Sequence, residues 1–154
     1  QIKVVEQQKT AALEADLRSG RVKPKNIGQA AIAYNAEIGV DLASAPKIRP
    51  DGKLYALPGK IAIADDSPEF LAQISLGAQN DALFRMTGRS SEIDGRYFYV
   101  KIPKALQAYY FDQAKIEHGF DLVGRYVANT KYKTIAGQQK SAPVFEAVYF
   151  VMRK

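Results

Sequence analysis

Apolar and polar residues change their spacing along this chain, from a helical period near its start to strict alternation near its end. Residues 2–18 carry scattered apolar side chains among Glu, Gln and Lys, which favours a helix. Gly20 ends this segment. Asn26 then stands at an N-cap position with Gln29 three residues later, which predicts a second helix over residues 27–38.

The next stretch has the pattern of a loop with short strands. Residues 44–60 contain three prolines and a tight turn at residues 50–52. Residues 53–57 and the alternating stretch 61–64 are each predicted to form a short strand.

Ser67-Pro68-Glu69 is a helix-start signal, with a capping Ser, Pro at the first position and an acid in the first turn. The apolar residues that follow fit a helical period, but residues 70–76 also alternate as in a strand. Because the capping signal is the more specific of the two, we predict a helix over residues 68–79.

From residue 82 onward the pattern becomes that of β-strands, with one helix between them. The predicted strands are residues 83–87, 97–102, 120–133 and 144–152. Pro103 is typical of a first helical turn, and His118 followed by Gly119 is typical of a helix end. A helix is therefore predicted over residues 103–118.

With one strand taken from residues 53–64, this order is three strands, a helix and two strands. The OB-fold has this order: a five-stranded barrel with a helix between its third and fourth strands. We therefore predict an α+β protein with an N-terminal helical segment over residues 1–43. Residues 44–154 are expected to form a compact OB-like antiparallel barrel or sheet with the helix inserted at about 103–118. A simple α+β sheet would give a similar order.

The net charge of +6 lies at the two ends of the sequence. Residues 1–60 carry 10 basic and 6 acidic side chains, residues 61–102 carry 4 and 6, and residues 103–154 carry 8 and 4. A basic balance favours an anionic partner such as nucleic acid, lipid headgroups or acidic glycans, and does not choose among them.

No stretch reaches the roughly 18 apolar residues that span a bilayer. The first residue is Gln1 and not Met, so we expect a processed, exported or periplasmic protein, with the cytoplasm as the alternative.

The sequence lacks the residues that several kinds of chemistry require. The sequence has no Cys and one His, which excludes disulfides, thiolate catalysis and Cys-based zinc sites. Phosphate-binding glycine loops and the GxSxG elbow do not occur. Asp65-Asp66 fits the start of a helix better than a metal site, and His118 fits a helix end better than a catalytic base. We predict no catalytic residue, metal or cofactor, and we favour a protein that is not an enzyme while leaving that question open.

Glu146 stands inside the apolar stretch 144–150. If it points inward, burial would raise its pKa and make it a candidate for hydrolysis together with a second acid. If it points outward, it is an ordinary surface residue, which is the orientation we favour. A hydrolase that uses Glu146 is the third functional hypothesis.

Aromatic and basic residues together form the candidate ligand face. In strand 97–102 strict alternation places Tyr97, Tyr99 and Lys101 on the face opposite the apolar residues. Exposed aromatic rings on a sheet stack on bases or sugars, while Lys and Arg follow a phosphate backbone. The long strand after the helix adds a second group: Arg125, Tyr126, Lys131, Tyr132 and Lys133.

These observations lead to a main hypothesis and an alternative. The main hypothesis is a binding or scaffold domain of the bacterial envelope that engages a protein, a glycan or another extended anionic ligand. Its predicted contacts are Tyr97, Tyr99, Lys101, Arg125, Lys131, Tyr132 and Lys133. The alternative is an OB-like nucleic-acid-binding module that uses the same face, and the oligomeric state is left open.

Overall fold

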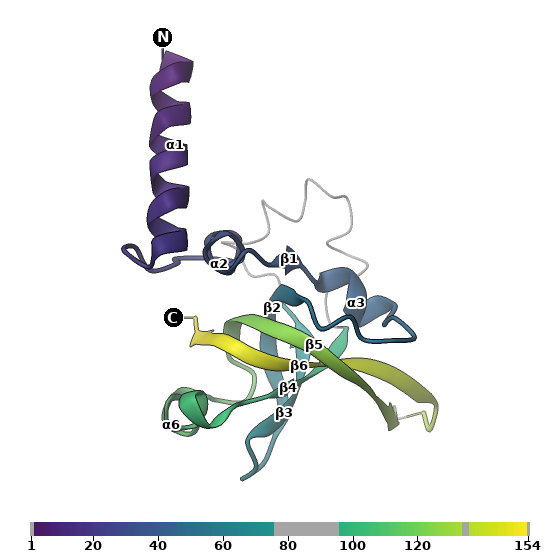
Figure 1. Ribbon diagram of the computed structural model, residues 1–154. Helices are drawn as coiled ribbons and strands as arrows, with labels where there is room; N and C mark the ends of the chain where they lie inside the picture. The colour runs from purple at the N-terminus through teal and green to yellow at the C-terminus, as the bar shows by residue number, and fades with distance from the viewer. Residues whose placement is uncertain (1, 76–95, 134–135, 154) are drawn as a thin grey trace.

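The computed structural model describes residues 2–75, 96–133 and 136–153, and of residues 2–10 and 44 it describes the backbone alone. The helices are α1 (Ile2–Ser19), α2 (Ile27–Tyr34), α3 (Val40–Ser44) and α6 (Lys104–Gln113). The strands are β1 (Glu37–Ile38), β2 (Leu54–Ala64), β3 (Glu69–Ile74), β4 (Tyr97–Lys101), β5 (Gly119–Lys133) and β6 (Gln139–Met152). In Figure 1, α1 projects away from the strands, while α2 and α3 lie along one side of them.

Five of the strands close into a barrel. β2 pairs antiparallel with β3 on one side and with β5 on the other, and β3 pairs antiparallel with β4. β6 lies between β4 and β5, antiparallel to β5 and parallel to β4. This closed order, with α6 between β4 and β5, is that of the OB-fold, so the predicted α+β OB-like barrel is confirmed. The barrel is mixed because of the β4–β6 pair, where antiparallel pairing was predicted.

The predicted N-cap of α2 is confirmed, although the helix is shorter than predicted. The backbone N–H of Gln29 donates to Oδ1 of Asn26 at 2.9 Å. The helix ends at Tyr34 because Asn35 adopts a left-handed conformation with φ 51°. The chain then forms β1, which pairs parallel with β2.

β2 is one long strand where the sequence predicted a loop and two short strands. It continues through Pro58 and Gly59, which are residue types that usually interrupt or weaken a strand. A Cβ on Gly59 would lie 2.8 Å from the ring of Phe120 and 2.9 Å from that of Phe98. The glycine therefore makes room for aromatic rings in the barrel interior.

The predicted helix over residues 68–79 is wrong in its described part, because residues Glu69–Ile74 form strand β3, and residues 76–79 lie outside the described residues. Phe70, Ala72 and Ile74 alternate into the core and are at most 2% exposed. The strand is paired along both edges, with β2 and with β4. Tertiary pairing therefore overrides the local capping signal. The predicted strand 83–87 lies outside the described residues.

The predicted helix over residues 103–118 ends earlier, at Gln113. After it the chain pairs with β2: the N–H of Glu117 donates to the carbonyl of Ile61 at 2.7 Å, and the N–H of Ile61 donates to the carbonyl of His118 at 3.2 Å. His118 therefore lies in the connection to β5 and not in the last helical turn, as we had predicted.

Aromatic rings fill the barrel. The largest of its buried side chains, all at most 2% exposed, are Tyr126, Phe70, Phe98, Phe120 and Phe145. The ring of Tyr110 from α6 stacks on Phe70 with centroids 5.3 Å apart, so α6 closes part of the barrel. Burying one such ring stabilises the fold by about 1.5–3 kcal/mol. Within the described part of the chain, no helix has both the length and the apolar character that crossing a bilayer requires.

Candidate functional site

β4 has the two faces that the sequence predicted. Phe98 and Val100 point into the barrel and are fully buried. Tyr97 and Tyr99 are partly exposed on the outer face, and Lys101 is exposed there. Regular alternation in a short strand without a bulge explains why the sequence placed these side chains correctly.

The hairpin of β5 and β6 brings a third tyrosine to the same face. The register of the two strands shifts between Tyr126 and Ala128, so that Val127 is an extra residue in β5. Beyond this bulge Tyr132 lies opposite Lys140 of β6. The rings of Tyr132 and Tyr97 are in contact, with centroids 5.3 Å apart. Tyr97, Tyr99 and Tyr132 together are called the tyrosine face below.

The tyrosine face has an apolar base. In the register of the barrel, Tyr99 lies between Leu71 of β3 and Val144 of β6. Both neighbours belong to the outer surface, yet they are only 8% and 5% exposed. Aromatic rings that rest on buried apolar side chains are held in place, which lowers the entropy lost when a ligand binds.

The other predicted contacts are divided among three places. Lys131 and Lys133 alternate with Tyr132 and so lie on the opposite side of the hairpin. Arg125 is on the outer surface, where its Nη1 donates to the carbonyl of Gly52 at 2.6 Å. Tyr126, which we grouped with them, is fully buried in the core. The structure therefore separates Lys131 and Lys133 from the tyrosines, and it places Arg125 on the same outer surface but beyond Glu146.

Two basic residues that the sequence analysis missed lie beside the tyrosine face. Lys140 is paired with Tyr132 in the hairpin register, and Arg96 immediately precedes β4, close enough to influence the titration of Tyr132. Burial first, and then the neighbouring Tyr97, raise the pKa of Tyr132, whereas Arg96 lowers it. Lys140 could have been predicted as a neighbour of Tyr132 only if the register of the β5–β6 hairpin had been known.

The acids near this surface limit its positive charge. Nζ of Lys101 lies 4.0 Å from Oε1 of Glu69, and both side chains are about half exposed. Glu146 lies between Lys101 and Arg125 in the strand register. A ligand with phosphates would meet cations and carboxylates in alternation along this part of the barrel.

Glu146 points outward and is exposed, which confirms the favoured orientation. Its neighbours in the register are two basic residues and not a second acid. A hydrolytic carboxyl pair needs two acids on opposite sides of one substrate bond. The hydrolase hypothesis built on a buried Glu146 is therefore wrong.

Comparisons with known proteins give no sequence relative and a weak structural likeness. No family model matches the chain, and no curated protein matches it. The chain is similar in fold to the mitochondrial single-stranded DNA-binding protein Rim1 of S. cerevisiae, with a TM-score of 0.44 and 6% identity over 68% of this chain and 97% of that one. It is also similar to the small single-stranded DNA-binding protein of Streptomyces coelicolor, with a TM-score of 0.40 and 13% identity over 67% and 95%.

This comparison corrects the main functional hypothesis. We predicted a binding or scaffold domain of the bacterial envelope, whereas these structures with a similar fold are single-stranded DNA-binding proteins. The envelope hypothesis finds no support in this comparison, and the nucleic-acid alternative agrees with it better. At TM-scores below 0.5 the likeness concerns the arrangement of the strands, so contacts with a ligand are argued from the surface of this chain.

Proposed function

We propose that this protein binds single-stranded nucleic acid, with bases stacked on Tyr97, Tyr99 and Tyr132. The observation that carries the proposal is the tyrosine face itself: three partly exposed rings, supplied by two separate strands, on an apolar base. Stacking on aromatic rings contributes about 1–3 kcal/mol for each base and tolerates any sequence.

The shape of this surface supports a single strand as the ligand rather than a duplex. A tyrosine ring can stack only on a base whose face is free, and the bases of a duplex are stacked on each other. Arg96 and Lys140 beside the rings, with Lys101 farther along β4, are suited to contact the phosphates of such a strand. A nucleic-acid ligand also favours the cytoplasmic alternative over the periplasm as the place where the protein acts.

The experiment measures binding of a fluorescein-labelled dT12 oligonucleotide by anisotropy. We expect Tyr97→Ala and Tyr132→Ala each to weaken binding by about 5- to 150-fold, the loss of one stacked base. Tyr99→Phe should bind nearly as well as the wild type because the ring remains. Phe111→Ala is the matched control, since Phe111 is an aromatic residue of α6 that is 53% exposed and lies outside the tyrosine face.

Urea unfolding of each variant separates lost contacts from lost structure. If an alanine variant is too unstable to test, Tyr97→Leu or Tyr132→Leu keeps apolar bulk on the base and still removes the ring. The proposal fails if the wild type does not bind dT12 in low salt, or if folded variants without the rings bind it as tightly as the wild type does.

A further inference from the structure

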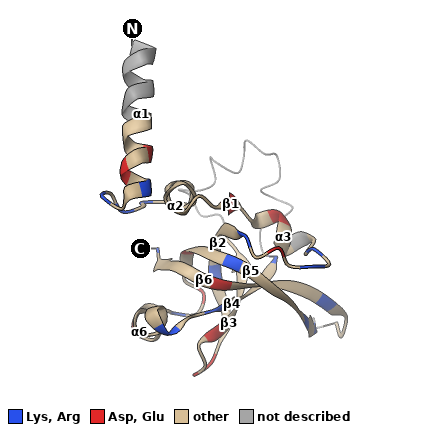
Figure 2. Cartoon of the chain, viewed as in Figure 1, with Lys and Arg blue, Asp and Glu red and all other residues tan. Residues whose placement is uncertain are grey.

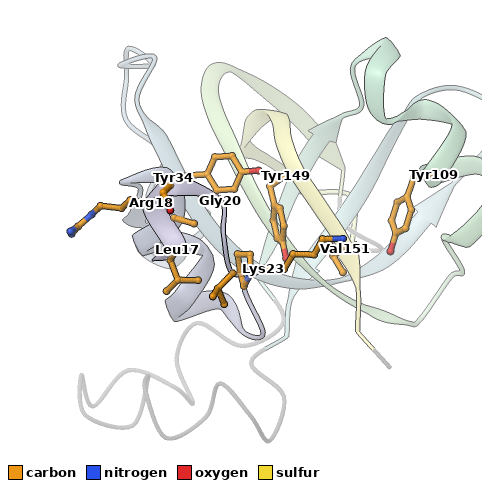
Figure 3. A pocket seen from close by; sticks show the side chains of 12 residues that line it. Leu17, Arg18, Gly20, Lys23, Tyr34, Tyr109, Tyr149 and Val151 are labelled. Atoms are coloured by element: carbon orange, nitrogen blue, oxygen red, sulfur yellow. The ribbon is translucent and has the colours of Figure 1, made fainter. Parts of the chain in front are cut away.

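A groove of about 660 Å³ lies away from the tyrosine face, between the N-terminal helices and the β6 and α6 surface (Figure 3). It is lined by Leu17, Arg18, Ser19, Gly20, Val22 and Lys23, by Pro24, Ala33 and Tyr34, and by Tyr109, Tyr149 and Val151. A volume of this size is typical of sites for small organic ligands.

Aromatic rings form its walls. Tyr34 of α2 and Tyr149 of β6 contact each other with ring centroids 5.5 Å apart. Tyr109 of α6 lies across Val151 from them (Figure 3), and its Oη accepts a hydrogen bond from the N–H of Met152 at 3.0 Å. Leu17, which is 2% exposed, adds apolar surface. The rings are therefore fixed by three separate elements.

The charges at the groove are of one sign. Arg18 and Lys23 are the charged residues among those that line it, and both are exposed; the side chain of Arg18 extends away from Tyr34 and Tyr149 at the outer edge of the groove (Figure 3). Glu14 reaches Nη2 of Arg18 at 3.8 Å on the α1 surface but does not line the groove. An apolar, ring-lined cavity with a basic edge is complementary to a flat aromatic group that carries an anion.

We propose that this groove is a second nucleotide site, in which a base packs against Tyr34 and Tyr149 while its phosphate contacts Arg18 and Lys23. The inference rests on the proposed function, since the nucleotide belongs to the strand that is bound at the tyrosine face. β6 connects the two places: Val144 forms part of the base of the tyrosine face, and Tyr149 lies in the groove five residues later. Five residues of a strand span about 17 Å, which an oligonucleotide of about a dozen residues covers.

The first experiment tests the groove alone, with dAMP as the probe and amide chemical shifts of the ¹⁵N-labelled protein as the readout. We expect dAMP to shift the amides of residues that line the groove. The double variant Arg18→Gln/Lys23→Gln should weaken dAMP at least about fivefold and leave deoxyadenosine, which has no phosphate, unchanged. Arg21→Gln/Lys25→Gln is the matched control, because both residues are exposed between α1 and α2 and neither lines the groove.

The second experiment compares dT4 with dT15 by anisotropy. The dT4 oligonucleotide should bind the wild type and the Arg18→Gln/Lys23→Gln variant equally well. The dT15 oligonucleotide should bind the variant at least about fivefold more weakly than it binds the wild type. Tyr34→Leu, which keeps apolar bulk, should act in the same way as the charge variant.

The outcomes separate this inference from the proposed function. The groove inference is overturned, and the proposed function stands, if three results occur together. These are that dT4 and dT15 bind through the tyrosine face, that dAMP shifts no groove amide, and that the groove variants change neither affinity. If no oligonucleotide binds while dAMP still shifts groove amides in a phosphate-dependent way, the proposed function is overturned and the groove is a site for a free nucleotide. If dAMP binds only to the tyrosine face, the groove inference also fails.

Discussion

Asp51 shows how a single carboxylate holds the loop before β2 in place. Its Oδ2 accepts hydrogen bonds from Nζ of Lys47 at 2.7 Å and from Oη of Tyr55 at 2.5 Å. Its Oδ1 accepts the backbone N–H of Lys53 at 3.0 Å. The carbonyl of Lys47 in turn accepts a hydrogen bond from Oη of the buried Tyr126 at 3.1 Å. The loop is thus tied to the barrel by one charged residue and its neighbours.

This network predicts a loss of stability in acid. Burial opposes ionisation of Asp51, but the hydrogen bonds from Lys47 and Tyr55 outweigh it and hold the pKa of Asp51 well below its ordinary value. The unfolded chain therefore binds a proton more readily than the folded one, and this contribution to stability decreases as the pH falls below about 4. Asp51→Asn should lower the free energy of unfolding at pH 7 by about 1 kcal/mol. Between pH 7 and pH 3 the variant should lose less of its unfolding free energy than the wild type does.

Urea unfolding of both proteins at a series of pH values checks this prediction. The difference in the free energy of unfolding between them should stay nearly constant until the pH approaches about 4 and should shrink below that value, because other titrating groups contribute to both proteins alike. A constant difference from pH 7 to pH 3 would show that Asp51 is not the group that titrates.

At the scale of elements, β3 and the β5–β6 hairpin show where sequence patterns fail. The capping signal at Ser67-Pro68-Glu69 is local, whereas the pairing of β3 with both neighbouring strands is not visible in the sequence. Alternation counted along β5 from Arg125 places Tyr132 on the wrong face. The extra residue Val127 changes that count, and a bulge has no sequence signature.

The contact between Tyr97 and Tyr132 should hold β4 and the β5–β6 hairpin together. Tilted aromatic pairs at 5.3 Å contribute about 0.5–1.5 kcal/mol beyond the area they bury. A double-mutant cycle with Tyr97→Leu and Tyr132→Leu should therefore show a coupling free energy of about 1 kcal/mol in urea unfolding. Tyr97→Leu combined with Val148→Ala, a partly exposed residue at the other bulge of the hairpin, should be additive. Additivity of the two tyrosine substitutions would mean that the rings do not support each other in solution.

At the scale of the molecule, the sequence predicted the barrel better than the ligand face. The order of strands and the helix predicted after Pro103 sufficed for the fold, although the ends of α2 and α6, the length of β2, the type of β3 and the direction of the β4–β6 pair were predicted wrongly. Of the seven predicted contacts, the register groups the three tyrosines and separates Lys131 and Lys133 from them. Charge balance told us only that both ends of the chain are basic, and Figure 2 shows Lys and Arg spread over several elements.

This spread of charge predicts a modest dependence of nucleic-acid binding on salt. Four cations lie on or beside the outer surface that carries the tyrosine face, namely Arg96, Lys101, Arg125 and Lys140. Each phosphate neutralised on a single strand contributes about −0.7 to the slope of log K against log salt, so four contacts give a slope no steeper than about −3. Glu69 and Glu146 stand among these cations and should make the slope shallower, so we expect about −2 for dT12 bound to the Arg18→Gln/Lys23→Gln variant, which lacks the cations of the groove. Glu146→Gln should then raise the affinity for dT12 in low salt, with little effect on the unfolding free energy. Anisotropy titrations between 25 and 300 mM NaCl measure the slope and the affinity, and urea unfolding measures the stability of the Glu146→Gln variant. A slope steeper than −4 would require phosphate contacts beyond this surface, and a slope near zero would leave stacking as the sole source of affinity.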